Sequence, residues 1–423
     1  MKRKFAILLS AMLLTQAVCG CGGAAPSATS SASASTDSTA SKSSEKAVIV
    51  TDEQDFTHEN GITRLAKEIY GDLNVEFFVL SEDTQERETQ ISSLRVEIMA
   101  GGGPDGYLLS SPTSNMTFNG EGHPATLFPD VQRTMQSGAF LPLDDYIKES
   151  KYLRSEDHFA PVFDTGKTDE GQVVLPITYY ASVFLLDKAQ LADPDFTPKT
   201  WDELVNCEDT AVLKVVRNNL YTWCGAGIPR IADYATEKTI LTEENLTAQF
   251  ENLLAMPASE SFDEETALIQ SGSYAQTDEG MAYYAQNKDT VNALAIPNTE
   301  GGVTAFITSY AAINRNSQKA DEVFRFFELL FSDEAQIDTE TVNDARGTLL
   351  MLGNQNSFLT HKNAYLQPEL LESVQSRVNA VRFYSVMDYT IYDTATTLTW
   401  EENPDCAAAA HSVIEALQTR LSE

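Results

Sequence analysis

Aromatic and polar side chains recur in this sequence directly after segments that have the pattern of β-strands. Together they can hold a polyhydroxylated ring, because tyrosine and tryptophan stack on its C–H faces while carboxylates, amides and hydroxyls pair with its hydroxyl groups. Each aromatic residue has a structural alternative, since an aromatic side chain at a strand end also fits a hydrophobic core. The candidates are Asp52, Asp55, Phe56, Ser110, Ser111, Asn115, Asn218, Tyr221, Trp223, Tyr283, Tyr389 and Tyr392.

Residues that carry catalysis or bind metal form no recognisable pattern. The five histidines are scattered, and the sequence has no Gly-x-Ser-x-Gly elbow, His-Glu-x-x-His helix or phosphate-binding loop. Cys207, Cys224 and Cys406 do not have the spacing of a zinc site, and a Cys207–Cys224 bridge stays open. We therefore expect no catalytic residue, metal or cofactor. A secreted glycan-degrading enzyme, which needs two carboxylates about 5–9.5 Å apart, is a less favoured alternative.

Alternating strands and helices must position these side chains. Apolar runs predict strands over Lys46–Thr51, Asn74–Leu80, Asp105–Ser110 and Leu213–Arg217. Helical spacing of apolar residues predicts helices over Ile62–Tyr70, Gln85–Ala100, Lys319–Phe331, Glu369–Val381 and Ala407–Leu421. Thr200 is expected to cap a helix that begins at Trp201, a core residue, and Tyr283 is placed in a loop after Gly280. The order of elements predicts an α/β fold with mainly parallel sheets.

Two apolar segments, Gln172–Asp187 and Val303–Arg315, exceed the usual strand length of about 3–10 residues. A strand that leaves one sheet and enters another has this length. We therefore expect two lobes, each assembled from both halves of the chain. Tyr179 and Tyr180 lie in the first segment and Tyr310 lies in the second.

The N-terminus has the features of an export signal. Lys2, Arg3 and Lys4 precede a short apolar stretch, and Val18-Cys-Gly-Cys21 resembles the lipobox of bacterial lipoproteins. Residues 1–20 are therefore predicted to be a signal peptide, Cys21 the lipidated residue, and 21–46 a flexible linker rich in Ser, Ala and Thr. A plain secretory leader is the alternative. The expected location is the outer face of the cell membrane.

Acidic residues outnumber basic ones by 62 to 29, which gives a formal net charge of −33. Such a chain repels nucleic acid and anionic lipid headgroups, so neither is an expected partner. The same charge leaves open a cationic ligand, such as a polyamine or a basic peptide.

Short motifs resemble, in order, those of the family 1 extracellular solute-binding proteins of ABC importers, the maltose-binding type. They are Gly103–Asp105, Gly138–Ile147, Asp169–Pro176 with Phe184–Lys188, Thr197–Leu204, and Ala312–Lys319 with the phenylalanine-rich helix that follows. The resemblance covers nearly all of residues 47–423. One departure is Gly272–Thr277, which lacks the methionine that the family shows before its last ligand loop.

This resemblance implies a two-lobe, class II periplasmic-binding-protein fold joined by hinge strands. Residues 47–176 and 301–345 would form lobe 1, and 177–300 and 346–423 would form lobe 2. Tyr179 and Tyr180 stand where the family presents a ligand contact, and Tyr310 lies at the second hinge crossing. A monomer would close around a small solute, such as a sugar or oligosaccharide, and deliver it to an ABC permease.

Overall fold

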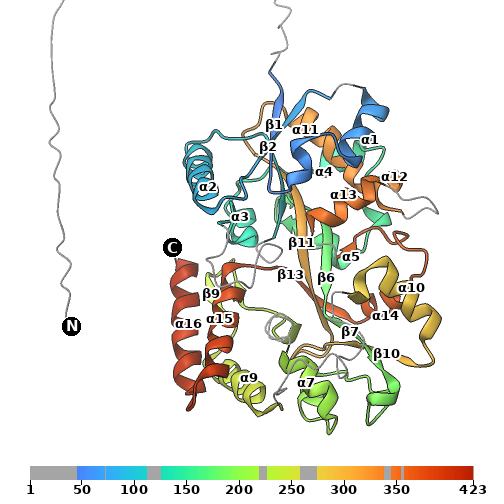
Figure 1. Ribbon diagram of the computed structural model, residues 1–423. Helices are drawn as coiled ribbons and strands as arrows, with labels where there is room; N and C mark the ends of the chain where they lie inside the picture. Colours follow the sequence, from blue (N-terminus) through green and yellow to red (C-terminus); the bar gives the residue numbers. More distant parts are fainter. Residues whose placement is uncertain are drawn as a thin grey trace, which may run out of the picture. The chain divides into compact units, whose positions relative to one another are not determined.

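A mixed sheet organises the fold around one long strand, β11 (Val303–Ile313), in which all 11 residues are buried. The computed structural model describes residues 45–71, 73–111, 125–218, 226–257, 274–337, 344–353 and 357–422, which belong to one compact unit. Within this part the sheet has the order β12-β6-β11-β3-β1-β2, with β13 also paired to β11. Figure 1 shows β6 and β11 side by side.

The pairing directions follow from the course of β11. β1 pairs in parallel with β2 and β3, and β13 pairs in parallel with β11, whereas β11 is antiparallel to β3 and β6. The sequence predicts mainly parallel pairing, whereas antiparallel pairs are as frequent as parallel ones in this sheet. The bounds are β1 Ala47–Thr51, β2 Val75–Val79, β3 Gly106–Ser110, β6 Leu175–Ala181, β12 Phe358–Leu359 and β13 Val378–Phe383. Three strand pairs lie outside the sheet: β7 (Val183–Asp187) with β10 (Val291–Ala295), β4 (Lys167–Thr168) with β5 (Gly171–Gln172), and β8 (Ala232–Asp233) with β9 (Lys238–Thr239).

Helices surround these strands, and their bounds are as follows. In the first half they are α1 Gly61–Tyr70, α2 Thr84–Met99, α3 Val131–Gln136, α4 Asp144–Glu149, α5 Ala160–Phe163, α6 Trp201–Val205 and α7 Thr210–Asn218. In the second half they are α9 Glu243–Ala255, α10 Asp278–Asn287, α11 Ala320–Phe327, α12 Asp333–Gln336, α13 Asp344–Leu352, α14 Glu369–Gln375, α15 Val386–Trp400 and α16 Cys406–Ser422. None of the described helices is both long and apolar enough to span a membrane.

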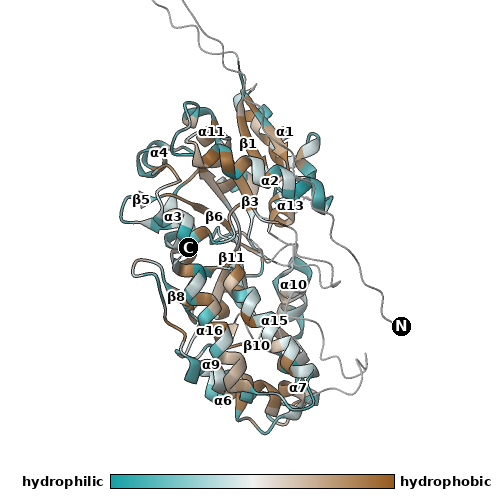
Figure 2. Cartoon of the chain, turned by 90° about the vertical axis from the view of Figure 1, so that its left-hand side faces the viewer, coloured by the Kyte–Doolittle hydropathy of each residue, from teal (hydrophilic) through white to brown (hydrophobic). Residues whose placement is uncertain are grey.

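Two hydrophobic clusters form the core. The larger gathers the side chains of the mixed sheet with α1 and α11, and the smaller gathers α6, α7, α9, α15 and α16. β7 lies between them, because Val183 and Leu185 belong to the larger cluster whereas Phe184 and Leu186 belong to the smaller. Figure 2 shows hydrophobic colouring on central strands such as β1 and hydrophilic colouring on peripheral loops.

The two hydrophobic clusters do not coincide with the predicted lobes. Leu349 of α13, Phe358 of β12 and Val374 of α14 belong to the larger cluster, although they fall in the range 346–423 assigned to lobe 2. The predicted lobe boundaries therefore stay a proposal.

Most predicted elements are confirmed. The first three strands and first two helices agree with β1, β2, β3, α1 and α2 to within about one residue. Both long apolar segments contain strands, β6 and β7 in the first and β11 in the second. The first passes from the mixed sheet to the β7–β10 pair as predicted, whereas all partners of β11 belong to one sheet, so the predicted crossing of the second segment between two sheets is wrong. Thr200 caps α6, and Trp201 is 1% exposed.

Three local predictions are wrong. Residues 213–217 belong to helix α7 rather than to a strand, because Val212 and Val216, four apart, face the smaller cluster. Tyr283 lies within α10 and not in a loop. The helix predicted to continue to Val381 ends at Gln375, and Val378–Phe383 instead forms β13, since its backbone pairs with β11.

Candidate ligand site

The carboxyl ends of two strands face each other on one side of β11. Ser110, which ends β3, is opposite Ser309, and Phe383, which ends β13, is opposite Ile307. Because β3 is antiparallel and β13 parallel to β11, the two strands approach Thr308 from opposite directions. In open α/β sheets, ligands bind outside the carboxyl ends of strands at such points. The facing ends of β3 and β13 are therefore the candidate site.

Asp52 ties the end of β1 to the end of β3. Its side chain is only 5% exposed, and it accepts hydrogen bonds from the backbone nitrogen (3.1 Å) and the hydroxyl (2.6 Å) of Ser110. Arg87 Nη2 of α2 lies 3.6 Å from Asp52 Oδ2. Burial raises the pKa of the Asp52 carboxyl above its ordinary value, whereas Ser110 and Arg87 oppose this shift. Asp52 thus acts as a strut that positions the neighbouring Ser111.

Hydroxyl groups hold the strands together beside this strut. Thr178 of β6 contacts the hydroxyls of Thr308 (2.8 Å) and Ser309 (2.6 Å) in β11, and Thr308 donates to Ser357 (2.8 Å). These side chains are all buried, and the bonds satisfy polar atoms that would otherwise be costly to bury. These hydrogen bonds, together with apolar packing, therefore hold β6 and Ser357 against β11.

A pocket of about 270 Å³ opens beside the end of β13. Its lining joins the two hydrophobic clusters, because Phe383 belongs to the larger one and Ile231 to the smaller. Polar and apolar side chains alternate around it. The lining residues are Gln132 of α3, Pro229, Arg230, Ile231, Ala232, Tyr234, Asn379, Ala380, Val381, Arg382, Phe383 and Ser385.

Arg382 forms one wall of this pocket and belongs to a row of side chains across three strands. Tyr180 of β6 is opposite Phe306 of β11, which is opposite Arg382 of β13, so all three lie on one face of the sheet. The Arg382 guanidinium lies 4.6 Å from the centre of the Phe306 ring. It forms a buried ion pair with Asp388 of α15 and donates to the carbonyl of Ile228 at 3.2 Å.

The other walls are joined by buried hydrogen bonds. Asp130 caps α3 by accepting from the backbone nitrogen of Arg133 at 3.0 Å, and it also accepts a hydrogen bond from the Tyr234 hydroxyl. Burial raises the pKa of Asp130. Asp388 accepts from the backbone nitrogen of Ser385 at 2.9 Å in the capping box of α15. These contacts hold α3, the segment 229–234 and the start of α15 around one cavity.

The structure separates the predicted site residues into groups. Asp52, Ser110 and Ser111 meet at the facing strand ends, and Asp55 accepts a hydrogen bond from Thr348 at 3.2 Å. Three aromatic residues are core side chains: Phe56 packs on Phe77 and Phe326, Tyr179 accepts from Gln375, and Tyr310 packs edge-on against Phe383.

The remaining candidates lie on helices or outside the described residues. Tyr283 packs against the larger cluster from α10. Tyr389 and Tyr392 lie on α15 with ring centres 6.2 Å apart, and the Tyr389 hydroxyl is 3.3 Å from Asp393 Oδ1. Asn218 ends α7, and its side chain is not among those described. Cys21, Asn115, Tyr221 and Trp223 lie outside the described residues. Cys207 has a free thiol.

Sequence reasoning missed the pocket residues Gln132, Arg230, Tyr234, Asn379 and Arg382. A signal for two of them was present. Val378, Ala380 and Arg382 alternate with their neighbours along one face of β13, and a strand over these residues would have placed Arg382 near its carboxyl end and Asn379 near its amino end.

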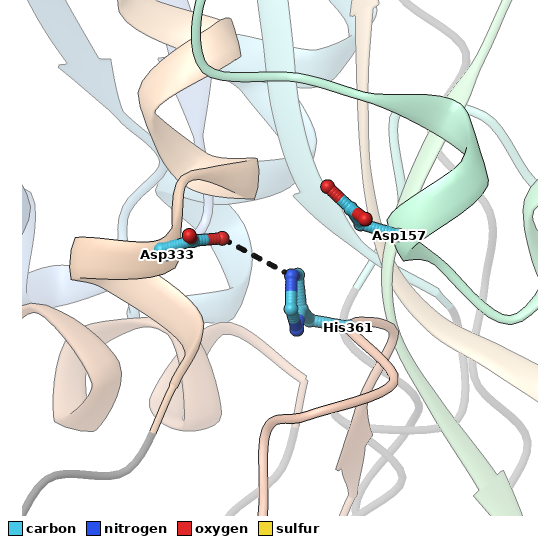
Figure 3. A group of neighbouring side chains, drawn as sticks. All are labelled: Asp157, Asp333 and His361. Carbon is cyan, nitrogen blue, oxygen red and sulfur yellow. Dashed lines mark ion pairs between the residues drawn. The ribbon is translucent and has the colours of Figure 1, made fainter.

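A separate group, Asp157, Asp333 and His361, has ligand atoms within 4.8 Å of one another and is drawn in Figure 3. His361 Nδ1 accepts from the backbone nitrogen of Asn363 at 3.1 Å, so in neutral His361 the proton is on Nε2. That nitrogen lies 3.2 Å from Asp333 Oδ1 and has no lone pair for a metal. Arg154 pairs with both carboxylates. The group is better described as an ion-pair network than as a metal site.

His158 lies next to this network and is fully buried. Its ring stacks on Phe163 with centres 5.4 Å apart, and Nδ1 is 3.1 Å from the Thr360 hydroxyl. Burial, followed by the charge of His361, lowers the pKa of His158 to about 3. The folded protein therefore holds His158 in its neutral form.

Comparison with known proteins defines the class of this fold. The sequence profile of the bacterial extracellular solute-binding proteins matches residues 57–337, and the chain belongs to this family. Its α/β architecture corresponds to the two-lobe periplasmic-binding-protein fold of that family. No curated protein matches the chain.

Solved structures agree with this assignment. The sugar-binding protein MalE from Xanthomonas citri is 11% identical, with a TM-score of 0.54 over 89% of this chain and 97% of that one. A family 1 extracellular solute-binding protein from Alicyclobacillus acidocaldarius is 10% identical, with a TM-score of 0.52 over 89% and 98%. An ABC substrate-binding protein from Listeria monocytogenes in complex with cycloalternan is 13% identical, with a TM-score of 0.50 over 89% and 99%. At these identities the likeness shows the fold.

The first prediction concerns the strut at Asp52. Asp52→Ala removes both contacts to Ser110 and leaves Arg87 as an unpaired buried charge, so the free energy of unfolding should fall by about 3–5 kcal/mol. The control is Asp344→Ala, which removes the partner of Arg64 in an exposed pair and should change stability by less than about 1 kcal/mol. Urea unfolding measures both values. Equal stability of the two variants would show that Asp52 is not a strut.

The second prediction concerns pH. The pKa of His158 is lowered when the protein folds, so its contribution is present above pH 6.5 and is lost as pH falls toward 3, because only the unfolded chain takes up the proton. Between pH 7 and 4.5 the wild type should lose about 2–3 kcal/mol more stability than His158→Phe. Denaturant unfolding at each pH measures this difference. As a control, a variant of exposed His411 keeps His158 and should lose at least as much stability as the wild type, because Glu243 raises the pKa of His411 and its protonated ring favours the fold at low pH. Parallel curves for wild type and His158→Phe would contradict the account.

Proposed function

We propose that this protein captures a sugar or oligosaccharide in the pocket between the two hydrophobic clusters and delivers it to an ABC permease. The pocket beside the end of β13 carries this proposal, because residues of both hydrophobic clusters line it. Asn379, Gln132 and Tyr234 offer polar groups for hydroxyls, and Pro229, Ile231 and Phe383 offer apolar surface for a pyranose ring. Closure of two such walls on a ligand is a hinge motion.

Two solved structures with the same fold support a carbohydrate ligand. The Xanthomonas protein is described as sugar-binding, and the Listeria protein is in complex with cycloalternan. The family and these neighbours are binding proteins, and we propose that this chain, too, has no catalytic activity.

Anchoring belongs to the same proposal. Lipidation at Cys21 and a linker over residues 21–46 would hold the binding unit near its permease on the outer face of the membrane. The protein would work as a monomer, because one chain supplies both walls of the pocket.

The cationic-solute alternative receives no support from the described pocket. Its lining includes Arg230 and Arg382 but no aspartate or glutamate. A polyamine or a basic peptide would therefore find no carboxylate side chain among the lining residues to pair with.

Thermal unfolding with a ligand panel tests this function. A saccharide that binds the folded state should raise the melting temperature by mass action, in proportion to the logarithm of its concentration, and 100 Kd of it should add about 2.7 kcal/mol. Spermidine and basic peptides should give no rise at low or moderate salt. Gln132→Ala, which removes a polar side chain that lines the pocket, should weaken saccharide binding by about 0.5–1.5 kcal/mol without unfolding the protein.

Stabilisation by cations alone, lost in salt, would overturn the sugar assignment. Release of product from a glycan panel under dilute protein would overturn the proposal of binding without catalysis.

A further inference from the structure

Helix α3 joins the two hydrophobic clusters at the edge of the pocket. Val131 and Met135 of α3 are buried in the larger cluster. The segment before α3 is fixed as well, because Arg95 of α2 donates to the carbonyl of Thr126 at 2.6 Å. One side of α3 therefore belongs firmly to the larger cluster, while Gln132 of the same helix lines the pocket.

The other side of α3 contacts elements of the smaller cluster. Asp130, the residue that caps α3, accepts a hydrogen bond from the hydroxyl of Tyr234, whose ring packs against the smaller cluster. Nη1 of Arg133 donates to the carbonyl of Arg420 at 2.5 Å. Arg420 lies in the last turn of α16, where backbone carbonyls lack helical partners and a nearby cation is favourable. Neither Asp130 nor Arg133 is among the residues that line the pocket, so both act on it from outside.

The first of these contacts holds the far end of one pocket wall, residues 229–234. The near end of the wall is fixed to β13, because Arg382 donates to the carbonyl of Ile228 at 3.2 Å. At the far end, Tyr234 is held by Asp130. Loss of the Asp130 contact would therefore free the wall to move about its near end.

The second contact holds the same wall through α16. Gln418 of α16 donates to the carbonyl of Glu237, in the turn between β8 and β9, at 2.9 Å. Arg133 fixes α16 two residues further along, at Arg420. Helix α3 thus holds the wall by two routes, directly through Asp130 and indirectly through Arg133.

Hydrogen bonds, rather than close packing, make the junction between α3 and the C-terminal helices. A cavity of about 180 Å³ lies among Asp130, Arg133, Met387 and Leu421, so little apolar surface is in contact there. Single hydrogen bonds contribute little net stability, and the junction can therefore open at small cost.

We infer that Asp130 and Arg133 are positioning residues of the ligand site, which hold the wall 229–234 beside α3 and so keep the pocket closed on a saccharide. The arrangement that places Gln132 and this wall around one pocket is the arrangement in which both contacts are made. A ligand that binds this arrangement favours it over any other, so loss of either contact should weaken binding. This inference rests on the proposed function, because it requires that the saccharide binds in this pocket.

Hydrogen exchange of the full chain without ligand tests the positioning role of Arg133. In Arg133→Gln, backbone amides of residues 229–239 should exchange about fivefold faster than in the wild type, because α16 is released from α3. Arg133→Lys restores a cationic donor and should exchange like the wild type. The matched control is Arg217→Gln, since Arg217 also donates to a carbonyl near the end of a helix, that of Leu253 in α9, but does so within the smaller cluster. This control should leave exchange of 229–239 unchanged.

Titration calorimetry with the tightest-binding saccharide of the panel tests the effect on the ligand site. Arg133→Gln should weaken binding about fivefold, although Arg133 does not line the pocket, and Arg133→Lys should restore it. Arg217→Gln should bind as tightly as the wild type even where its melting temperature is lower.

Two variants of Asp130 separate its cap from its contact with Tyr234. Asp130→Asn keeps an oxygen for both, so saccharide binding should stay as in the wild type. Asp130→Ser keeps a capping oxygen but is too short to reach the Tyr234 hydroxyl, so binding should weaken as in Arg133→Gln.

The outcomes distinguish this inference from the proposed function. Equal exchange of 229–239 in the wild type and Arg133→Gln would overturn the positioning role. Faster exchange combined with unchanged or tighter saccharide binding would show that α3 does not close the pocket on a ligand, and the proposed function would stand. A wild type that binds no saccharide would refute the proposed function, whereas the exchange comparison would still decide whether α3 holds the wall.

Discussion

The pairing of β11 is the constraint on which the rest of the structure depends. All 11 of its residues are buried, and it shares hydrogen bonds with β6 on one side and with both β3 and β13 on the other. Two strands can share one side only if each covers part of it, and here they meet end to end at Thr308. Asp52, Ser110 and Ser111 lie at that junction, and the pocket begins beside it at Phe383 and Ser385.

Polar groups that are buried at the junction need hydrogen-bond or ion-pair partners. Asp52 with Arg87 and Ser110, Arg382 with Asp388, and the hydroxyl set of Thr178 and Thr308 each satisfy atoms that water cannot reach. An incomplete set is more costly than an apolar core, so these networks fix one arrangement of the strand ends.

Local pattern was sufficient for the elements near the N-terminus and for the long strands. β1, α1, β2, α2 and β3 follow from alternation or helical spacing, and the length of the apolar segment Val303–Arg315 predicts a long strand, although β11 stays within one sheet. It was insufficient where long-range pairing decides the outcome. From the sequence alone, the helix that begins at Glu369 is predicted to continue to Val381, and Leu213–Arg217 is predicted to be a strand. Pairing with β11 makes Val378–Phe383 a strand, and packing of Val212 and Val216 on the smaller cluster makes α7 a helix.

Long-range strand pairing also decides which residues of the candidate site the sequence can predict. Asp52 and Ser110 were predicted because they end strands that the sequence reveals directly. Tyr179 and Tyr310 were predicted as ligand contacts, but neighbouring strands bury them. Arg230, Gln132 and Arg382 come from distant segments, and only the completed sheet brings them together.

Hydrogen exchange of the backbone with and without ligand tests the central claim that the ligand binds at the facing strand ends. A second pocket of about 350 Å³, lined by residues such as Thr63, Leu73 and Phe77 of the α1–β2 region, provides the competing location. With the tightest-binding saccharide at saturation, exchange should slow in segments 229–234 and 379–385 and stay unchanged in 58–77. Protection confined to 58–77 would contradict the account.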